Sequence, residues 1–142
     1  MKVRIKTHDS KPLFYETEGA CAFDFRAKED VIIAPWKVGL VDTWTAIEIP
    51  RWYAMVVLPR SSTFKNFGLI QVNWVGIIDN DYCWNNDTTL FQYLNMTDKE
   101  AKIEAWTRIG QGMFVKIWLA EFELVDDLEN KDRWWFWTTW NK

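Results

Sequence analysis

N-W-V-G-I-I-D-N-D-Y, residues 73–82, is an apolar run that ends in two carboxylates and an aromatic hydroxyl. We expect a strand here whose aliphatic side chains are buried and whose polar side chains stand at its end. The aliphatic residues are Val75, Ile77 and Ile78, and the polar residues are Asp79, Asp81 and Tyr82. A buried strand is a rigid base that can hold a reactive group in place. Taken alone, however, the stretch is better explained as a strand that runs into an Asp-Asn-Asp turn, since these residues bond their own backbone.

Short runs of this kind, separated by turn residues, extend along the whole chain. In residues 2–7, Val3 and Ile5 alternate with basic residues, which is typical of a half-buried strand. Further strands are expected at 22–27, 31–34, 38–41, 45–49, 53–58, 69–72, 88–94, 108–117 and 121–125. Residues 97–104 alone have a helix-like composition, and a turn fits them equally well. So many short strands predict an all-β fold with little helix, either a barrel or a two-sheet sandwich.

Composition agrees with one compact domain in a chain of 142 residues, 49% of them hydrophobic. The 17 basic and 20 acidic residues are interspersed, so we expect neither a nucleic-acid partner nor a membrane partner. No leader and no bilayer-length apolar run is visible, which predicts a soluble, cytoplasmic protein. Two cysteines are too few for a disulfide framework or a zinc site.

Three other segments carry polar groups that suit a phosphate or a metal. They are E-G-A-C-A-F-D-F-R-A (18–27), P-R-S-S-T-F-K-N-F-G (59–68) and T-R-I-G-Q (107–111). Asp24 stands between two phenylalanines, so in a strand it faces away from both. Arg60, with the hydroxyls of Ser61 and Ser62, suits phosphate oxygens. Taken alone, each segment has a simpler explanation. Asp24 would be an exposed strand residue, Ser61 and Ser62 would form a turn, and Arg108 of the third segment would be a surface cation.

Together, in this order and at these spacings, the four segments resemble the trimeric deoxyuridine triphosphatase (dUTPase) family, especially its shorter bacterial and phage type. The resemblance runs from about residue 2 to the last residue. It implies a distorted β-barrel or jelly roll over residues 1–130 and a C-terminal arm over 131–142. It also implies a homotrimer with sites between subunits, and Mg²⁺-assisted hydrolysis of dUTP to dUMP and pyrophosphate.

The resemblance also implies a role for each site residue. Asp79 corresponds to the carboxylate that orients and deprotonates the attacking water, while Asp81 is structural. Tyr82 corresponds to a tyrosine under the deoxyribose that excludes ribonucleotides, and Asn73 to a residue that helps to read uracil. Asp24 would hold Mg²⁺ through water molecules. The residues expected to contact phosphate are Arg60, Ser61, Ser62, Arg108 and Gln111.

The C-terminal arm is where this chain departs from the family. The shorter family members end R-G-G-(F/L)-G-S-T-G, a glycine-rich arm that stacks its aromatic residue on the base and bonds the γ-phosphate. Here the same frame reads R-W-W-F-W-T-T-W, residues 133–140. Arg133 and Phe136 are kept, but every glycine of the arm is tryptophan.

The same exchange recurs through the chain, which has eleven tryptophans and only six glycines. Five tryptophans stand where the family usually has a turn glycine: Trp36, Trp44, Trp52, Trp84 and Trp106. Trp74 and Trp118 occupy more variable positions. We hypothesise that glycine codons were written as tryptophan, because UGA is read as Trp in some genetic codes and as Gly in others. A deliberate or tolerated natural substitution is the rival. As written, each tryptophan at a glycine turn would carry about 1–3 kcal/mol of backbone strain.

Two other function classes stay open. A deoxycytidine triphosphate deaminase shares the fold and a similar R-S-S element, but it requires a catalytic Glu on the strand after the Asp motif. Residues 82–97 contain no Glu. A non-catalytic nucleotide-binding or regulatory homologue is the other alternative, because the arm is altered.

Overall fold

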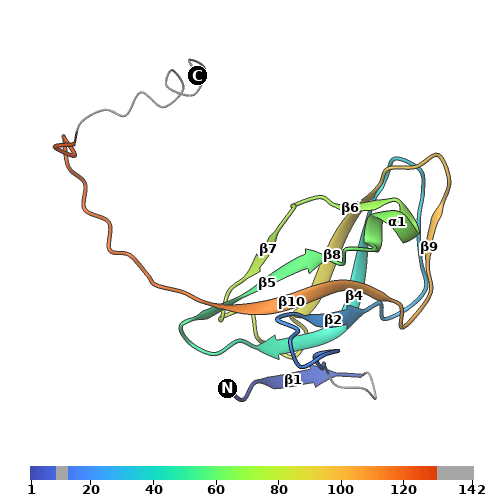
Figure 1. Cartoon of the computed structure of the whole chain (residues 1–142), viewed down its shortest axis with the longest axis horizontal. Coiled ribbons are helices and arrows are strands. Elements are labelled where there is room, and N and C mark those ends of the chain that lie inside the picture. Colours follow the sequence, from blue (N-terminus) through green and yellow to red (C-terminus); the bar gives the residue numbers. More distant parts are fainter. Residues whose placement is uncertain (9–12, 131–142) are drawn as a thin grey trace.

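The computed structural model describes residues 1–8 and 13–130. The expected arm, with Arg133 and Phe136, lies outside the described residues. The strands are β1 (Arg4–Thr7), β2 (Phe23–Arg26), β3 (Val31–Ile33), β4 (Val38–Glu48), β5 (Tyr53–Pro59), β6 (Leu69–Gln71), β7 (Gly76–Ile78), β8 (Thr88–Asn95), β9 (Ala101–Ile103) and β10 (Arg108–Lys116). One short helix, α1 (Thr63–Phe67), is present in the described part. The expected all-β fold with little helix is confirmed (Figure 1).

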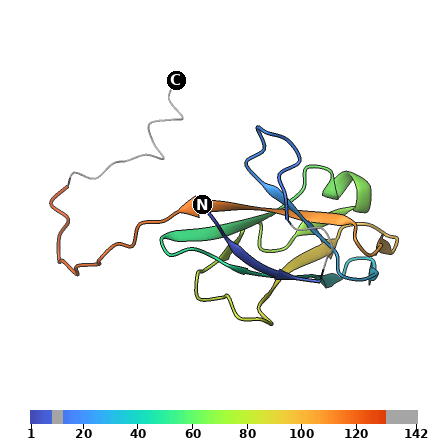
Figure 2. The ribbon, with the colours of Figure 1, turned by 90° about the horizontal axis from the view of Figure 1, so that it is seen from below.

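The strands form three antiparallel sheets. The first has the order β1-β4-β8-β6, the second β2-β10-β5-β7, and the third pairs β3 with β9. The core lies between the two four-stranded sheets, where Phe25 of β2 packs against Phe91 of β8 with ring centroids 5.6 Å apart. After β10, residues 117–130 extend away from the sheets in both views (Figures 1 and 2). No helix in residues 1–8 or 13–130 is long and apolar enough to cross a membrane.

Several expected elements are different in the structure. Residues 97–104 contain strand β9 instead of a helix, because Ala101 and Ile103 are buried while Lys102 is exposed, the alternation of a strand. Residues 121–125 form no strand, and Leu124 is fully exposed. The expected strands 38–41 and 45–49 are one continuous strand, β4, with an irregularity in its pairing to β8.

The 73–82 stretch is also less buried than expected. Ile78 packs against the core, but Ile77 is 68% exposed and Val75 is 47% exposed. Adjacent residues of a strand point to opposite faces, so Ile77 and Ile78 cannot both enter a core that lies on one side of the sheet. The strand itself, β7, spans only three residues at the edge of its sheet.

Five tryptophans adopt positive φ angles, between 55° and 72°. They are Trp36, Trp44, Trp52, Trp74 and Trp106. Four of them are among the five positions where a turn glycine was expected. Trp84 is not in this conformation, whereas Trp74, assigned to a variable position, is. Bulky residues rarely adopt this conformation, which glycine takes at little cost.

Candidate active site

Asp24 lies between two guanidinium groups on the second sheet. Its Oδ1 accepts a hydrogen bond from Nε of Arg60 at 2.8 Å, and its Oδ2 accepts one from Nη1 of Arg108 at 3.2 Å. Nη1 of Arg108 also donates to Oε1 of Glu16 at 2.6 Å. The Asp24 side chain is only 13% exposed. Within residues 1–8 and 13–130, these bonds use one nitrogen of each guanidinium and leave its other N–H groups for an anionic ligand.

Strand β10 brings these residues together because it pairs with both β2 and β5. Gln111 is opposite Asp24 in one pairing, and Gly110 is opposite Pro59 in the other. The Nε2 group of Gln111 donates to the Pro59 carbonyl at 3.1 Å, next to Arg60. The structure therefore brings four of the expected site residues to one end of the second sheet. They are Asp24, Arg60, Arg108 and Gln111.

A bulge in β10 puts Arg108 and Gln111 on the same face. The two residues are three positions apart, a spacing that places side chains on opposite faces of a regular strand. Their partners on β2, Arg26 and Asp24, are only two positions apart, so β10 has one extra residue. Ile109 and Gly110 are accordingly buried side by side.

The serines lie in the turn that links β5 to α1, as the simpler explanation had it. Ser62 is the N-cap residue of α1, but its side chain makes no capping bond. Thr63 stabilises the turn instead, because its Oγ1 accepts the N–H of Arg60 at 3.0 Å. Ser61, next to Arg60 in the chain, is exposed.

Asp79, Tyr82 and Asn73 lie on exposed turns that flank β7. The N–H of Tyr82 donates to the Asp79 carbonyl at 3.3 Å, and its hydroxyl donates to the Thr88 carbonyl at 3.2 Å. These bonds fix Tyr82 close to Asp79. Asn73 precedes the strand and Asp79 follows it.

Asp79 is far from the guanidinium groups within one chain. It follows Ile78, which is opposite Met55 near the start of β5, whereas Arg60 comes just after the end of β5. Six residues of strand, from position 54 to position 60, span about 20 Å. In Figure 1, β5 points toward α1, the end that carries Arg60. A single chain therefore does not bring all the expected residues around one ligand.

An apolar hollow of about 250 Å³ adjoins Arg60 and Ser61. Its lining includes Phe64, Gln71 and Trp74, which the sequence analysis did not single out for the site. Gln71 is 6% exposed, its Nε2 donates to the Val57 carbonyl, and its Oε1 has no hydrogen-bond partner among the described residues. A glutamine on the buried face of the L-I-Q strand was the signal available in the sequence.

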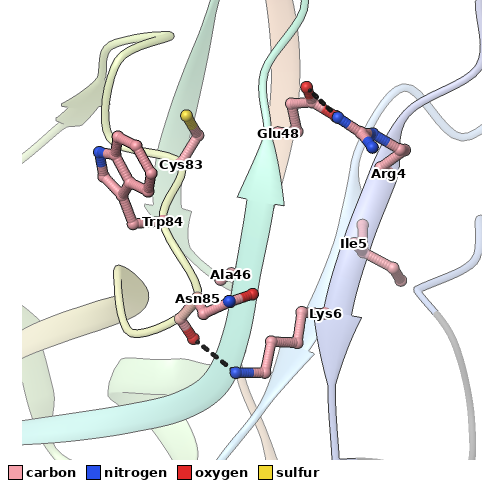
Figure 3. A pocket seen from close by; sticks show the side chains of 8 residues that line it. All are labelled: Arg4, Ile5, Lys6, Ala46, Glu48, Cys83, Trp84 and Asn85. Carbon is pink, nitrogen blue, oxygen red and sulfur yellow. Dashed lines mark hydrogen bonds and ion pairs between the residues drawn. The ribbon is translucent and has the colours of Figure 1, made fainter.

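A second hollow, of about 320 Å³, contains none of the expected site residues (Figure 3). Arg4 and Glu48 form a two-bond ion pair at its edge, with Nη2 and Oε1 2.6 Å apart. The hydrogen bond between them raises the pKa of Arg4 and lowers the pKa of Glu48. Lys6 donates to the Asn85 carbonyl at 3.1 Å. The charged side chains that line this hollow are thus already paired with each other or with a backbone carbonyl.

Asp24, the residue expected to hold Mg²⁺, already has both carboxylate oxygens bonded to guanidinium groups. The described residues contain no group of three or more His, Cys, Asp or Glu side chains arranged to hold a metal. Mg²⁺ usually keeps several water molecules and binds one or two carboxylates together with substrate phosphates. A carboxylate oxygen can accept more than one hydrogen bond, so each oxygen of Asp24 could also accept one from a metal-bound water.

Comparison with known proteins agrees with the fold and with the family that the motifs resemble. The dUTPase family model matches residues 9–134. The SPbeta prophage-derived deoxyuridine 5'-triphosphate nucleotidohydrolase YosS of Bacillus subtilis is 38% identical over 135 residues, which cover 94% of both chains. A deoxyuridine 5'-triphosphate nucleotidohydrolase of Helicobacter pylori (strain Shi470) is 33% identical over 135 residues, covering 94% of this chain and 91% of that one.

Two solved structures are similar as well. The dUTPase of Streptococcus mutans superposes with a TM-score of 0.77 at 28% identity, over 86% of this chain and 100% of that one. The dUTPase of Staphylococcus bacteriophage 80alpha has a TM-score of 0.79 at 19% identity, over 91% and 99% of the two chains. The second likeness supports the fold alone.

Proposed function

The chain belongs to the dUTPase family, and we propose that it hydrolyses dUTP to dUMP and pyrophosphate. The relatives named as deoxyuridine 5'-triphosphate nucleotidohydrolases support this activity. A deaminase is disfavoured because residues 82–97 contain no Glu to act as its catalytic residue.

In this proposal Asp79 orients a water molecule toward the α-phosphorus. The carboxylate accepts a proton as the water oxygen bonds to phosphorus, and the bond between the α-phosphorus and the bridging oxygen breaks. The leaving pyrophosphate takes up negative charge, which the guanidinium groups of Arg60 and Arg108 stabilise. Gln111, Ser61 and Ser62 donate further hydrogen bonds to phosphate. Asp24 is the residue that would hold Mg²⁺, which would supply additional neutralisation of the phosphate charge when bound.

The nucleoside is recognised by residues near Asp79. Asn73 has an amide that can donate and accept at once, as a uracil edge requires. The ring of Tyr82, fixed by its bond to the Thr88 carbonyl, packs under the deoxyribose and leaves no space for a 2′-hydroxyl.

The active form is a homotrimer with sites between subunits. Sites between subunits are supported by the separation of about 20 Å between Asp79 and Arg60 along β5, and the number of three subunits comes from the family resemblance. A second copy that brings its Asp79 to the Arg60 end of the first would complete the site. The exposed apolar residues of the 70–77 segment would be covered by such contacts: Ile70, Val72, Trp74, Val75 and Ile77. The arm, residues 131–142 with Arg133 and Phe136, would close over the nucleotide from a neighbouring copy onto the domain of residues 1–130.

Mixed oligomers test the activity and the assembly together. Asp79→Asn and Arg60→Ala are each expected to abolish pyrophosphate release from dUTP with Mg²⁺. If the two groups of one site come from different chains, coexpression of the two variants should restore activity to about one quarter of the parent value, the share of sites that receive both intact residues. Light scattering after gel filtration measures the assembly in parallel.

Three outcomes would contradict the proposal. A parent chain that binds dUTP without releasing pyrophosphate would identify a non-catalytic nucleotide-binding protein. Deamination of dCTP would identify the other enzyme class. An active parent whose two variants never complement each other would place the whole site in one chain and remove the argument for the trimer.

A further inference from the structure

The carbonyl oxygen of Ile109 accepts hydrogen bonds from two buried hydroxyls. The Tyr93 hydroxyl donates at 2.6 Å and the Thr63 hydroxyl donates at 3.4 Å. Ile109 is at the bulge, where the pairing of β10 with β2 passes from Arg108 directly to Gly110. All three residues are at most 3% exposed. A buried carbonyl outside the regular strand pairing needs such donors, because an unsatisfied one is costly.

Thr63 links this carbonyl to the backbone of Arg60. Its Oγ1 accepts the Arg60 N–H at 3.0 Å, and its own N–H donates to the Arg60 carbonyl, also at 3.0 Å. Both backbone polar groups of Arg60 are therefore bound to Thr63, which in turn is bound to Ile109. The network joins the turn that carries Arg60 and Ser61 to the strand that carries Arg108.

The position of the Tyr93 ring is fixed by its neighbours on the same face. The ring stacks on Phe91, with centroids 6.0 Å apart and planes 7° apart. Gly110 lies directly over Phe91, since a Cβ atom there would come within 2.1 Å of Cε1. Burial also raises the pKa of Tyr93 far above its usual value, so its hydroxyl stays protonated and can always donate.

We propose that Tyr93 and Thr63 are positioning residues for phosphate binding, which set the distance between the Arg60 turn and the Arg108 strand through the shared Ile109 carbonyl. Neither side chain contacts the substrate. This inference rests on the proposed hydrolysis of dUTP and adds two residues to it. Positioning matters here because donors that are placed in advance stabilise a transition state much more than donors that must be reoriented.

Conservative variants test the network. Tyr93→Phe removes one hydroxyl and keeps the ring, Thr63→Val removes the other, and Thr63→Ser keeps an Oγ in place. The matched control is Thr43→Val in β4, because Thr43 is also buried and its hydroxyl also donates to a carbonyl, that of Thr89, at 2.8 Å. This control lies in the first sheet and has no bond to the site residues.

We expect kcat/KM for dUTP to fall about five- to tenfold in Tyr93→Phe and in Thr63→Val, the loss of roughly one hydrogen bond. Most of the fall should appear in kcat, because misplaced donors are felt mainly in the transition state. Thr63→Ser should keep kcat/KM close to the parent value. Thr43→Val should lower the urea midpoint of unfolding as much as Thr63→Val does, with unchanged kcat/KM.

Two results would overturn the inference while leaving the proposed function intact. One is an active Tyr93→Phe variant with kcat/KM within twofold of the parent. The other is a Thr43→Val variant that loses as much activity as Thr63→Val, which would make the effect one of general stability. A parent chain that neither hydrolyses dUTP nor binds its imido analogue in calorimetry would instead overturn the proposed function, and this inference with it.

Discussion

At a tryptophan with a positive φ angle, replacement by glycine should give a more stable protein than replacement by alanine, whereas alanine is normally the more stable of the two. Trp74 and Trp106 have φ angles of 57° and 66°, whereas Trp84 and Trp118 are outside the positive-φ region. Each tryptophan would be replaced by alanine and by glycine. Both variants delete the ring, so their difference reports only the Cβ atom and the freedom of the backbone.

The magnitude follows from the backbone conformation. The left-handed region costs an L-residue about 1–2 kcal/mol that glycine avoids. Glycine in turn costs about 0.5–1 kcal/mol through the greater freedom of the unfolded chain. The glycine variant should therefore be the more stable by about 1 kcal/mol at Trp74 and Trp106, and the less stable by about 0.5–1 kcal/mol at Trp84 and Trp118.

Urea unfolding followed by circular dichroism measures this difference without depending on tryptophan fluorescence. With a slope of about 2 kcal/mol/M, the glycine and alanine midpoints should differ by about 0.5 M at the first two positions. All variants must be compared at one protein concentration, since an oligomer's apparent stability depends on it. Equal midpoints at Trp74 and Trp106, or alanine favoured at all four positions, would refute the reasoning.

The same measurement bears on the origin of the tryptophans. Strain of about 1–3 kcal/mol at each of five sites would approach the total stability of a typical domain, about 5–15 kcal/mol. A chain with glycine at all five positions should then be much more stable than the chain as written. The coding DNA decides the origin directly, because UGG codons at these positions would eliminate the decoding hypothesis.

Three further predictions concern packing, pH and metal. Gly110→Ala should lower the free energy of unfolding by about 1–3 kcal/mol in thermal or urea melts, because its Cβ would come within 2.1 Å of a Phe91 ring carbon, whereas Gly19→Ala, with nothing within 4 Å, should be neutral. The raised pKa of Tyr93 favours the folded state below the ordinary tyrosine pKa of about 10, and this stabilisation is lost as the pH rises above 10. Between pH 9 and 11 the parent should therefore lose unfolding free energy more steeply than Tyr93→Phe. Parallel curves of stability against pH for the two proteins would contradict this prediction. Asp24→Asn should raise the Mg²⁺ concentration needed for half-maximal dUTP hydrolysis about tenfold, and an unchanged Mg²⁺ dependence would exclude Asp24 from the metal site.

Most of the fold could be predicted because alternation of apolar and polar residues is a local signal. The F-D-F-R strand is an example: Phe23 and Phe25 are buried, and Asp24 faces the other side, as expected. Helix-like composition misled at residues 97–104, where the A-K-I segment alternates and pairs as a strand with β3. Alternation itself failed at residues 121–125, whose apolar residues have no strand beside them in the described part of the chain.

The candidate site was only partly predictable for a related reason. The motifs identified Asp24, Arg60, Arg108 and Gln111, which the structure brings together. The amino-acid sequence does not reveal that Asp79 lies at the opposite end of β5 from Arg60, because that position depends on the antiparallel register between β5 and β7. The Tyr93 network was missed because its acceptor is a backbone carbonyl, which leaves no signature in the amino-acid letters.

Because of the bulge at Ile109, the face on which each β10 side chain lies depends on the number of residues in the strand more than on their types. One extra residue converts an odd spacing into an even one, so that the guanidinium of Arg108 and the amide of Gln111 lie on the same face of the sheet. Deleting a residue here would keep every charged group in the sequence, yet it would turn one of the two toward the hydrophobic interior. Relatives of this chain should therefore tolerate changes of residue type at position 109 more readily than changes of length.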